Sequence, residues 1–295
     1  MKDTARLLFY FAGTLLVGAL LAPVLFWAAQ SPSAHRMLPM LSRFDFETYF
    51  HRALLISALL LLWPLLRALQ VRGWRDLGLE KNRRKTHDVL AGFLIAAIPL
   101  LCCGAALVLL QIYSLRPAIL WGKLGTVVFA SAFVPLIEEL LFRGLILGVL
   151  LRSNSRIAAM VLTSALFAVL HFLKAPDQTT PASDVNWASG FVSIANAFWQ
   201  FRDPMLLAAG FTTLFVIAWI LADARLKTRS LWLPIGLHAG WIFSNGAFSR
   251  AAHREHLVLP WIGKDLMVGI APLIVAVASW ALMNGWLNYV RSRQT

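Results

Sequence analysis

Charged residues are scarce in this sequence, and acidic residues are the scarcest of them. Asp, Glu, Lys and Arg make up 14% of the 295 residues, and hydrophobic residues make up 59%. A typical soluble domain has about 25% charged residues, so this chain has too few to cover the surface of a water-soluble protein of its size. Several apolar runs reach the roughly 20 residues that a helix needs to cross the hydrocarbon of a bilayer. The composition therefore predicts an integral membrane protein.

The shortage of Asp and Glu gives the chain a formal net charge of +13 and an isoelectric point near 10.7. A strong basic excess can be the footprint of a nucleic-acid-binding surface. In membrane proteins, however, Lys and Arg collect on cytoplasmic loops and set the topology. We adopt the second interpretation and expect no nucleic-acid partner.

Cysteine is also rare, with two residues in the whole chain. Cys102 and Cys103 are adjacent within an apolar run, so a disulfide that closes a useful loop is implausible. The sequence also has no internal repeat, low-complexity tract or linker. We therefore predict a single domain over residues 1–295.

Hydrophobic runs predict about eight transmembrane helices in one bundle, which makes the expected fold all-α and polytopic with a polar cavity inside the membrane. The predicted spans are residues 7–29, 53–69, 89–112, 124–151, 157–173, 205–222, 231–247 and 266–290. If the N-terminus is cytoplasmic, most of the 27 Lys and Arg residues lie on cytoplasmic segments, many of them between Arg67 and Lys85. We therefore expect both termini in the cytoplasm, and we expect the membrane to be a bacterial inner membrane.

The longest segment outside these spans, residues 174–203, is not simply polar. Residues 190–201 read GFVSIANAFWQF, a stretch too short to span and typical of an interfacial or re-entrant helix. Two interpretations remain open, namely aromatic anchoring at the membrane surface and a lid over the mouth of the bundle.

Three ionisable residues occur within one predicted span. Glu138, Glu139 and Arg143 lie in the fourth span, with apolar runs on both sides. An ionisable side chain inside a bilayer costs about 2.5–3.5 kcal/mol even on the lenient insertion scale. Glu139 and Arg143 are one helical turn apart and can pair, whereas Glu138 is expected to point elsewhere. A carboxylate in such surroundings suits a general base or a metal ligand.

Two further spans contribute histidine. His171 ends the run FAVLH in the fifth span, and His238 lies in the seventh span, about two turns before Asn245. Each histidine alone is more often a packing residue than a ligand. Together with two buried glutamates they form a set of residues that can activate a water molecule or hold a divalent metal.

These motifs resemble those of a known family. EELLFR at residues 138–143 and FAVLH at residues 167–171 match the EExxxR and FxxxH motifs of the CPBP family, the CAAX-processing and bacteriocin-processing intramembrane proteases also called Abi. His238 falls where the third motif of that family begins. The resemblance covers a protease-like core at about residues 124–250. The third motif often has Asn or Asp four residues after its histidine, where this chain has Ile242.

The resemblance implies an intramembrane endopeptidase that cuts a membrane protein or a lipidated or hydrophobic peptide. It assigns water activation to Glu138 and His171, and oxyanion stabilisation or metal binding to His238. Glu139 and Arg143 become a structural pair. Either Asn245 substitutes for the missing Asn or Asp in catalysis, or that role is absent. Glu138, His171 and His238 would be the ligands of a divalent metal, with zinc as the candidate.

Two other functional classes stay open. In an ion- or proton-coupled transporter, the buried glutamates and histidines would relay protons, but the sequence shows no matching broken helices in two halves, as inverted-repeat transporters do. A non-catalytic immunity or assembly partner could keep the same fold, and Ile242 favours that alternative. Two other protease classes are excluded because the sequence has neither an HExxH zinc motif nor a serine in a GxSG context.

Overall fold

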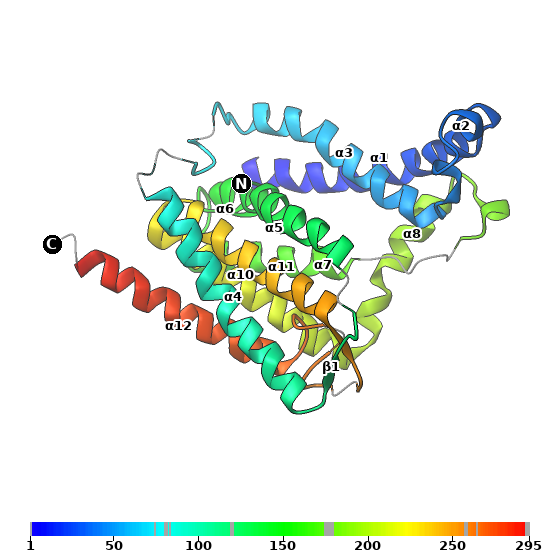
Figure 1. Cartoon of the computed structure of the whole chain (residues 1–295). Helices are drawn as coiled ribbons and strands as arrows, with labels where there is room; N and C mark the ends of the chain where they lie inside the picture. Colours follow the sequence, from blue (N-terminus) through cyan, green and yellow to red (C-terminus); the bar gives the residue numbers. More distant parts are fainter. Residues whose placement is uncertain are drawn as a thin grey trace. The chain divides into compact units, whose positions relative to one another are not determined.

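The computed structural model describes residues 2–73, 75–79, 82, 84–118, 121–173, 180–256, 259–263 and 265–292. Regular structure in these residues is helical apart from two short strands, which pair as one antiparallel ribbon (Figure 1). The all-α prediction is therefore confirmed. The chain divides into two compact units, one formed by Met1–Arg72 with His171–Asp203 and the other by Gly73–Leu170 with Pro204–Thr295. The single-domain organisation stays a prediction.

The first unit is built on a pair of long helices. Its elements are α1 (Lys2–Gln30), α2 (Pro32–Met37), η1 (Leu41–Arg43), α3 (Phe46–Ala68), η4 (Ala182–Asp184), α8 (Ser189–Ala197) and η5 (Phe198–Arg202). Asp45 caps α3 by accepting a hydrogen bond from the Thr48 amide at 2.9 Å, which satisfies a backbone donor that the first turn leaves open. Phe26 of α1 packs edge-on against Phe46 and Tyr49 of α3.

The segment between the fifth and sixth predicted spans contributes helix α8 to this unit. Residues 174–179 lie outside the described residues. Helix α8 buries Gly190, Ser193 and Ala197 along one face and exposes Phe191 and Val192 on another. A short amphipathic helix of this kind fits the expected interfacial helix; the alternative role as a lid stays a hypothesis.

The second unit contains the remaining helices and the β-ribbon. Its elements are α4 (Lys85–Leu109), β1 (Tyr113–Leu115), η2 (Trp121–Lys123), α5 (Leu124–Glu139), η3 (Leu140–Ile146), α6 (Leu147–Leu150), α7 (Arg156–Phe172, whose last two residues belong to the first unit), α9 (Pro204–Leu206), η6 (Leu207–Phe211), α10 (Thr212–Thr228), α11 (Trp232–Ala251), β2 (Ala252–Arg254) and α12 (Ile270–Ser292). Segments α5, η3 and α6 continue one another, with the middle one wound as a π-helix.

Close packing of α4 against α11 fixes the orientation of His238. A Cβ atom on Gly236 would lie 2.2 Å from the Val89 carbonyl oxygen, and one on Gly240 would lie 2.4 Å from the Phe93 carbonyl oxygen. Glycine at both positions lets the two backbones touch, as small residues do between membrane helices. Residue 238 lies halfway between these glycines, and at about 100° per residue it projects from the opposite face of α11. The sequence therefore turns His238 away from α4.

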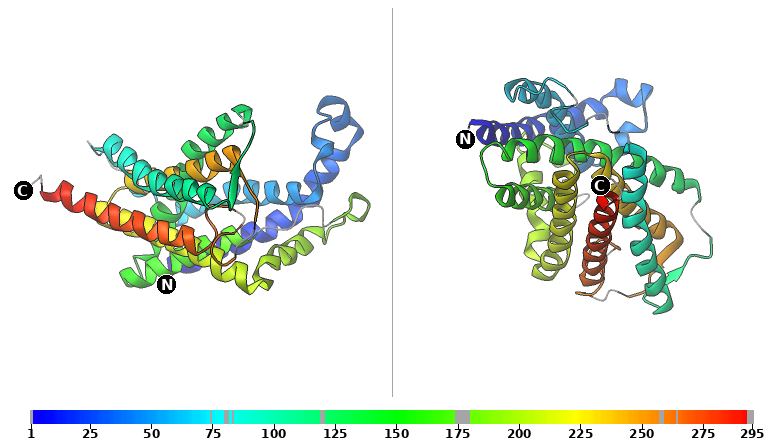
Figure 2. Two further views of the ribbon diagram at one scale, coloured as in Figure 1. Left: turned by 60° about the horizontal axis from the view of Figure 1, so that its bottom comes forward. Right: turned by 90° about the vertical axis from the view of Figure 1, so that its left-hand side faces the viewer.

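An ionic cluster ties α10 to α12 within the same unit. Asp223 accepts hydrogen bonds from Lys227 Nζ at 2.5 Å and from Trp280 Nε1 at 2.8 Å. Lys227 also donates to Asn284 Oδ1 at 2.6 Å. Figure 2 shows α4, α10 and α12 running alongside one another, with α10 and α12 in contact. The cluster satisfies the nearly buried Asp223 carboxylate, which would be costly to bury alone.

The number of membrane spans is lower than the predicted eight when length and hydropathy are required together. Five helices in the described part of the chain are long and apolar enough to cross a membrane, namely Lys2–Gln30, Phe46–Ala68, Lys85–Leu109, Leu207–Thr228 and Ile270–Ser292. Helical segments also occupy the other three predicted ranges. However, α7 is shorter, the predicted span 124–151 is divided by the π-helix between α5 and α6, and α11 is not among the five. The chain is thus a multi-pass membrane protein, and the count of eight is not confirmed.

The Gly236 contact predicts the sign of one substitution. Alanine usually stabilises a helix relative to glycine by about 0.8–1.0 kcal/mol, and Gly285→Ala on α12, where no atom lies within 4 Å, should be neutral or stabilising. Gly236→Ala should instead lower the melting temperature, because the new methyl group meets the Val89 carbonyl. Thermal unfolding of the purified variants, monitored by the loss of the monodisperse size-exclusion peak with temperature, measures both effects. Equal melting temperatures for the two variants would contradict the close packing.

Candidate active site

The three ionisable residues of the fourth predicted span lie where α5 changes its winding. Glu138 and Glu139 end α5, and Arg143 lies in the π-helix that follows. Pro135 precedes them by one turn and removes a backbone hydrogen bond from the helix. Short π-helical segments concentrate at functional sites because they change the direction of the side chains that follow. The altered winding therefore coincides with the polar residues.

Glu139 holds two partners with a single oxygen. Its Oε1 accepts hydrogen bonds from Arg143 Nη1 at 2.9 Å and from His238 Nδ1 at 2.8 Å. The side chains of Glu139 and Arg143 are fully buried, and that of His238 is 7% exposed. The pair predicted from the one-turn spacing is thus present. The histidine contact joins α5 to α11, a connection that the spacing within one helix could not predict.

Arg143 has two further interactions, and the first ties the site to α10. Its Nη2 donates to the Ala218 carbonyl oxygen at 3.0 Å. The guanidinium carbon also lies 4.7 Å from the ring centre of Phe167, within the range of a cation–π interaction. Arg143 therefore fixes Glu139 relative to two other helices, α7 and α10.

The contact with Glu139 determines which nitrogen of His238 carries a proton. A carboxylate paired with arginine can only accept hydrogen bonds, so Nδ1 must be the donor. In the neutral imidazole, Nε2 then has a free lone pair. Carboxylates that hold metal-binding histidines orient the ring in the same way. Glu139 thus makes Nε2 of His238 the nitrogen available for chemistry.

That nitrogen faces Glu138. His238 Nε2 lies 3.7 Å from Glu138 Oε2, and the Glu138 side chain is 25% exposed. The separation exceeds a direct hydrogen bond, but one water oxygen can lie within hydrogen-bond distance of both atoms. Helical spacing predicted that Glu138 and Glu139 point in different directions. The two glutamates approach opposite nitrogens of one imidazole, and the ring spans the angle between adjacent helical positions.

Phe167, the first residue of the FxxxH motif, also lies beside this site, and the sequence alone gave it no role. Its ring lies 6.0 Å from the His238 ring and 4.9 Å from the Phe142 ring, both edge-on. Phe167 is 2% exposed, so it forms an apolar wall beside the buried polar residues. Its place in the motif could have identified Phe167 as part of the site, because an apolar motif residue acts through packing.

For the other two predicted residues, His171 and Asn245, a place in this cluster stays a prediction. His171 is exposed in the last turn of α7 and belongs to the first unit, so its approach to Glu138 stays a prediction. Asn245 lies two turns beyond His238 on α11, and its Oδ1 accepts a hydrogen bond from the Leu266 amide at 3.1 Å. A catalytic role for Asn245 also stays a prediction.

The fit of the expected metal can be judged from the donor set. Among the described residues, no group of three or more His, Cys, Asp or Glu side chains is arranged to hold a metal ion. Glu138 and His238 supply two adjacent donors, and a structural zinc site has four protein ligands while a catalytic one has three. The residues brought together here do not by themselves fit a metal.

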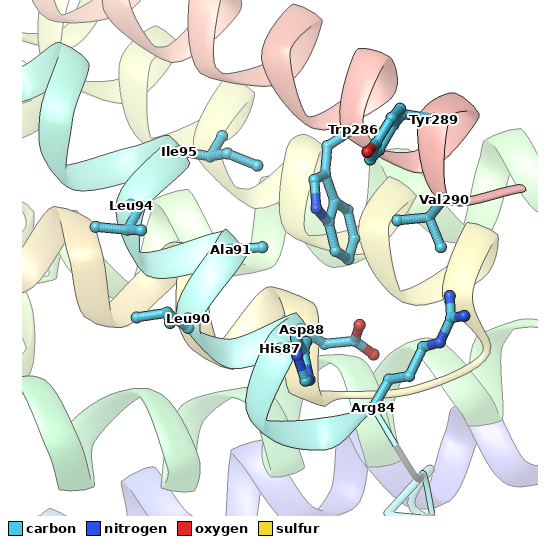
Figure 3. Close-up of a pocket in the computed structure, with 10 residues that line it drawn as sticks. All are labelled: Arg84, His87, Asp88, Leu90, Ala91, Leu94, Ile95, Trp286, Tyr289 and Val290. Atoms are coloured by element: carbon cyan, nitrogen blue, oxygen red, sulfur yellow. The ribbon is translucent and has the colours of Figure 1, made fainter. Parts of the chain in front are cut away.

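A cavity separate from this cluster lies elsewhere in the second unit. It has a volume of about 730 Å³ and lies between α4 and α12, where Arg84, Asp88 and Trp286 are among its lining residues. Figure 3 shows the Asp88 carboxylate and the Trp286 indole facing the space between these helices. A concave, mostly apolar pocket is the usual first choice for an active site, but neither Glu138 nor His238 lines this one. Its mixture of aromatic, basic and apolar residues is typical of a membrane-facing groove at the interface.

Comparison with known protein families agrees with the motifs. Residues 120–244 match the family described as type II CAAX prenyl endopeptidase Rce1-like. The matched stretch contains Glu138, Glu139, Arg143, His171 and His238. No curated protein and no solved structure matches the chain. The predicted resemblance to the CAAX-processing proteases is therefore confirmed over this stretch.

The buried cluster of Glu139, Arg143 and His238 predicts that the main role of Arg143 is in folding and not in the chemical step. Breaking a buried ion pair by removing one partner typically costs about 3–5 kcal/mol, so Arg143→Ala should sharply reduce the yield of folded, monodisperse protein. Arg6→Ala, which breaks a solvent-exposed pair with Asp3, should leave the yield unchanged. Fluorescence-detected size-exclusion chromatography of the two variants makes the comparison. Normal folding of Arg143→Ala with loss of activity alone would instead place the arginine in the chemistry.

Proposed function

We propose that the protein is an intramembrane endopeptidase that hydrolyses a peptide bond in a membrane-associated protein or peptide. One observation carries the proposal: a carboxylate and an imidazole nitrogen, Glu138 Oε2 and His238 Nε2, face each other at 3.7 Å in a mostly buried site. This pair lies within the stretch that matches the CAAX prenyl endopeptidase family. General-base hydrolysis needs such a pair beside a confined water molecule.

In the proposed mechanism, Glu138 takes a proton from the attacking water. The lone pair on His238 Nε2 accepts the other hydrogen of that water and so directs its oxygen toward the substrate carbonyl. This use of Nε2 follows from the Nδ1 contact with Glu139. The family resemblance gave His238 an oxyanion role, which would require Nε2 to be protonated and to donate. Holding the water is the role that the neutral imidazole supports.

His171 is the proposed partner of Glu138. Phe167 and His171 are one turn apart on α7 and therefore share a face of that helix, and Phe167 packs against His238 and Arg143. A histidine on that face is suited to donate a proton to the leaving amine and to be reprotonated by Glu138, which took its proton from the water. A divalent ion such as zinc stays part of the proposal only if His171 adds a third donor to Glu138 and His238. No step above depends on the ion.

The proposed substrates and location follow from the family and the membrane spans. The family description names prenyl endopeptidases, so we propose peptides or proteins that carry a lipidated or strongly hydrophobic end. We further propose a bacterial inner membrane with both termini in the cytoplasm, supported by the basic residues between the second and third spans.

The decisive experiment removes the base and its partner separately and together. Glu138→Gln and His171→Ala should each reduce cleavage by at least roughly 10²-fold, since general acid–base catalysis contributes on the order of 10²–10⁴. The double variant should be little worse than either single variant, because residues that act as one unit are not additive. Cleavage of CAAX-type peptides, farnesylated and unmodified, is measured in proteoliposomes at matched protein levels.

The control is Glu255→Gln, which neutralises an exposed glutamate beside His253 and should retain full cleavage. Unchanged cleavage by Glu138→Gln would rule out the general-base role and favour a non-catalytic partner with this fold. Proton-coupled uptake that depends on Glu138, with no cleavage by the unmodified protein, would favour the transporter.

A further inference from the structure

A pocket with one charged side chain lies on the same pair of helices as Glu138 and His238. It occupies about 410 Å³ between α5 and α11, and its walls include Thr126 and Ala130 of α5 and Ile242, Asn245 and Arg250 of α11. No Asp or Glu lines it. Most of its surface is apolar, and the arginine supplies its only charge among the described residues.

Arg250 has no partner for that charge. It forms no hydrogen bond or ion pair with any described residue, and its Nε is buried without a hydrogen-bond partner. By contrast, Arg143 pairs with Glu139, and Arg254 donates to the Gly263 carbonyl oxygen. A partly desolvated guanidinium with no counter-ion is costly in a membrane protein unless a ligand supplies the negative charge. An anionic ligand in this pocket would therefore stabilise the Arg250 guanidinium.

Helix register places this pocket in line with the catalytic pair. Helices α5 and α11 are antiparallel, because Glu139 meets His238 at one end and Val127 packs on Gly246 at the other. Ala130 and Glu138 are about two turns apart on one face of α5, as are His238 and Asn245 on one face of α11. The pocket and the pair thus occupy one line along the boundary between the two helices.

The separation matches a short length of peptide. Arg250 follows His238 by slightly more than three turns, which is roughly 18 Å along the helix axis. An extended chain advances about 3.3–3.6 Å per residue, so about five residues cover that distance, and fewer when the arginine side chain reaches toward the site. A carboxylate at Arg250 would therefore lie a few residues from a peptide bond held at Glu138.

A carboxylate is the anion that the polar groups fit. The planar guanidinium can bind both oxygens of a carboxylate. The Asn245 oxygen is occupied by the Leu266 amide, and its Nδ2 donates to no described residue, so that nitrogen is a second donor at the same wall of the pocket. We propose that Arg250 and Asn245 bind the free C-terminal carboxylate of the peptide whose bond Glu138 attacks. The proposal rests on the endopeptidase function above, and it explains why Ile242 can be apolar, since it lines a peptide-binding groove.

Binding to an inactive enzyme tests this site without requiring turnover. Full-length Glu138→Gln protein in zwitterionic nanodiscs is titrated with one hydrophobic, fluorescent twelve-residue peptide, supplied as the free acid and as the C-terminal amide. The free acid should bind about tenfold more tightly than the amide. Adding Arg250→Gln should abolish that preference, Arg250→Lys should retain part of it, and Arg229→Gln, an exposed arginine outside the pocket, should leave it intact.

Two results would overturn the proposal. One is equal affinity for acid and amide with Arg250 present. The other is retention by Arg250 of an anionic phospholipid, detected by mass spectrometry from mixed-lipid nanodiscs, with no preference for the acid. Cleavage by the unmodified protein is assayed in parallel. Glu138-dependent cleavage without an acid preference would remove the carboxylate site alone, whereas an Arg250-dependent acid preference without any cleavage would remove only the endopeptidase function.

Discussion

The site depends on one buried carboxylate, Glu139, which accepts hydrogen bonds from both Arg143 and His238. Glu139 Oε1 receives both Arg143 Nη1 and His238 Nδ1 where the surroundings are apolar and the three side chains are almost entirely buried. Each partner alone would leave an uncompensated polar group inside the bundle. Because one oxygen of Glu139 holds both Arg143 and His238, it fixes the imidazole and leaves its second nitrogen facing Glu138. Glu139 and Arg143 thus position His238, and Glu138, with a side chain 25% exposed, is the least buried member of the cluster.

Close helix packing makes that arrangement possible. Glycines at 236 and 240 bring the α11 backbone against α4, and this contact turns His238 toward α5. The π-helix after Glu139 then carries Arg143 back beneath the glutamate while its guanidinium also reaches Ala218 of α10. The same antiparallel pair, α5 and α11, continues into the pocket at Arg250. The proposed catalytic pair and the proposed carboxylate pocket therefore share one helix–helix boundary.

The sequence was most informative about features that depend on neighbouring residues of one helix. The cost of charge in an apolar run identified Glu138, Glu139 and Arg143, and helical spacing paired the last two correctly. The contact between Glu139 and His238 could not be predicted, because it joins residues 99 positions apart and depends on the register of two helices. The π-helix likewise has no signal in a hydrophobic pattern. The count of eight spans was not confirmed, because an apolar run does not by itself show how long the continuous helix within it is.

The central claim is that Glu139 sets the tautomer of His238, and nitrogen NMR tests it directly. Full-length protein labelled with ¹⁵N-histidine is reconstituted in liposomes, and the His238 signals are assigned by comparison with His238→Asn. The account predicts a protonated Nδ1 and an unprotonated Nε2 for the neutral ring, with this preference weakened in Glu139→Gln. A neutral His238 with its proton on Nε2, unaffected by Glu139→Gln, would contradict it.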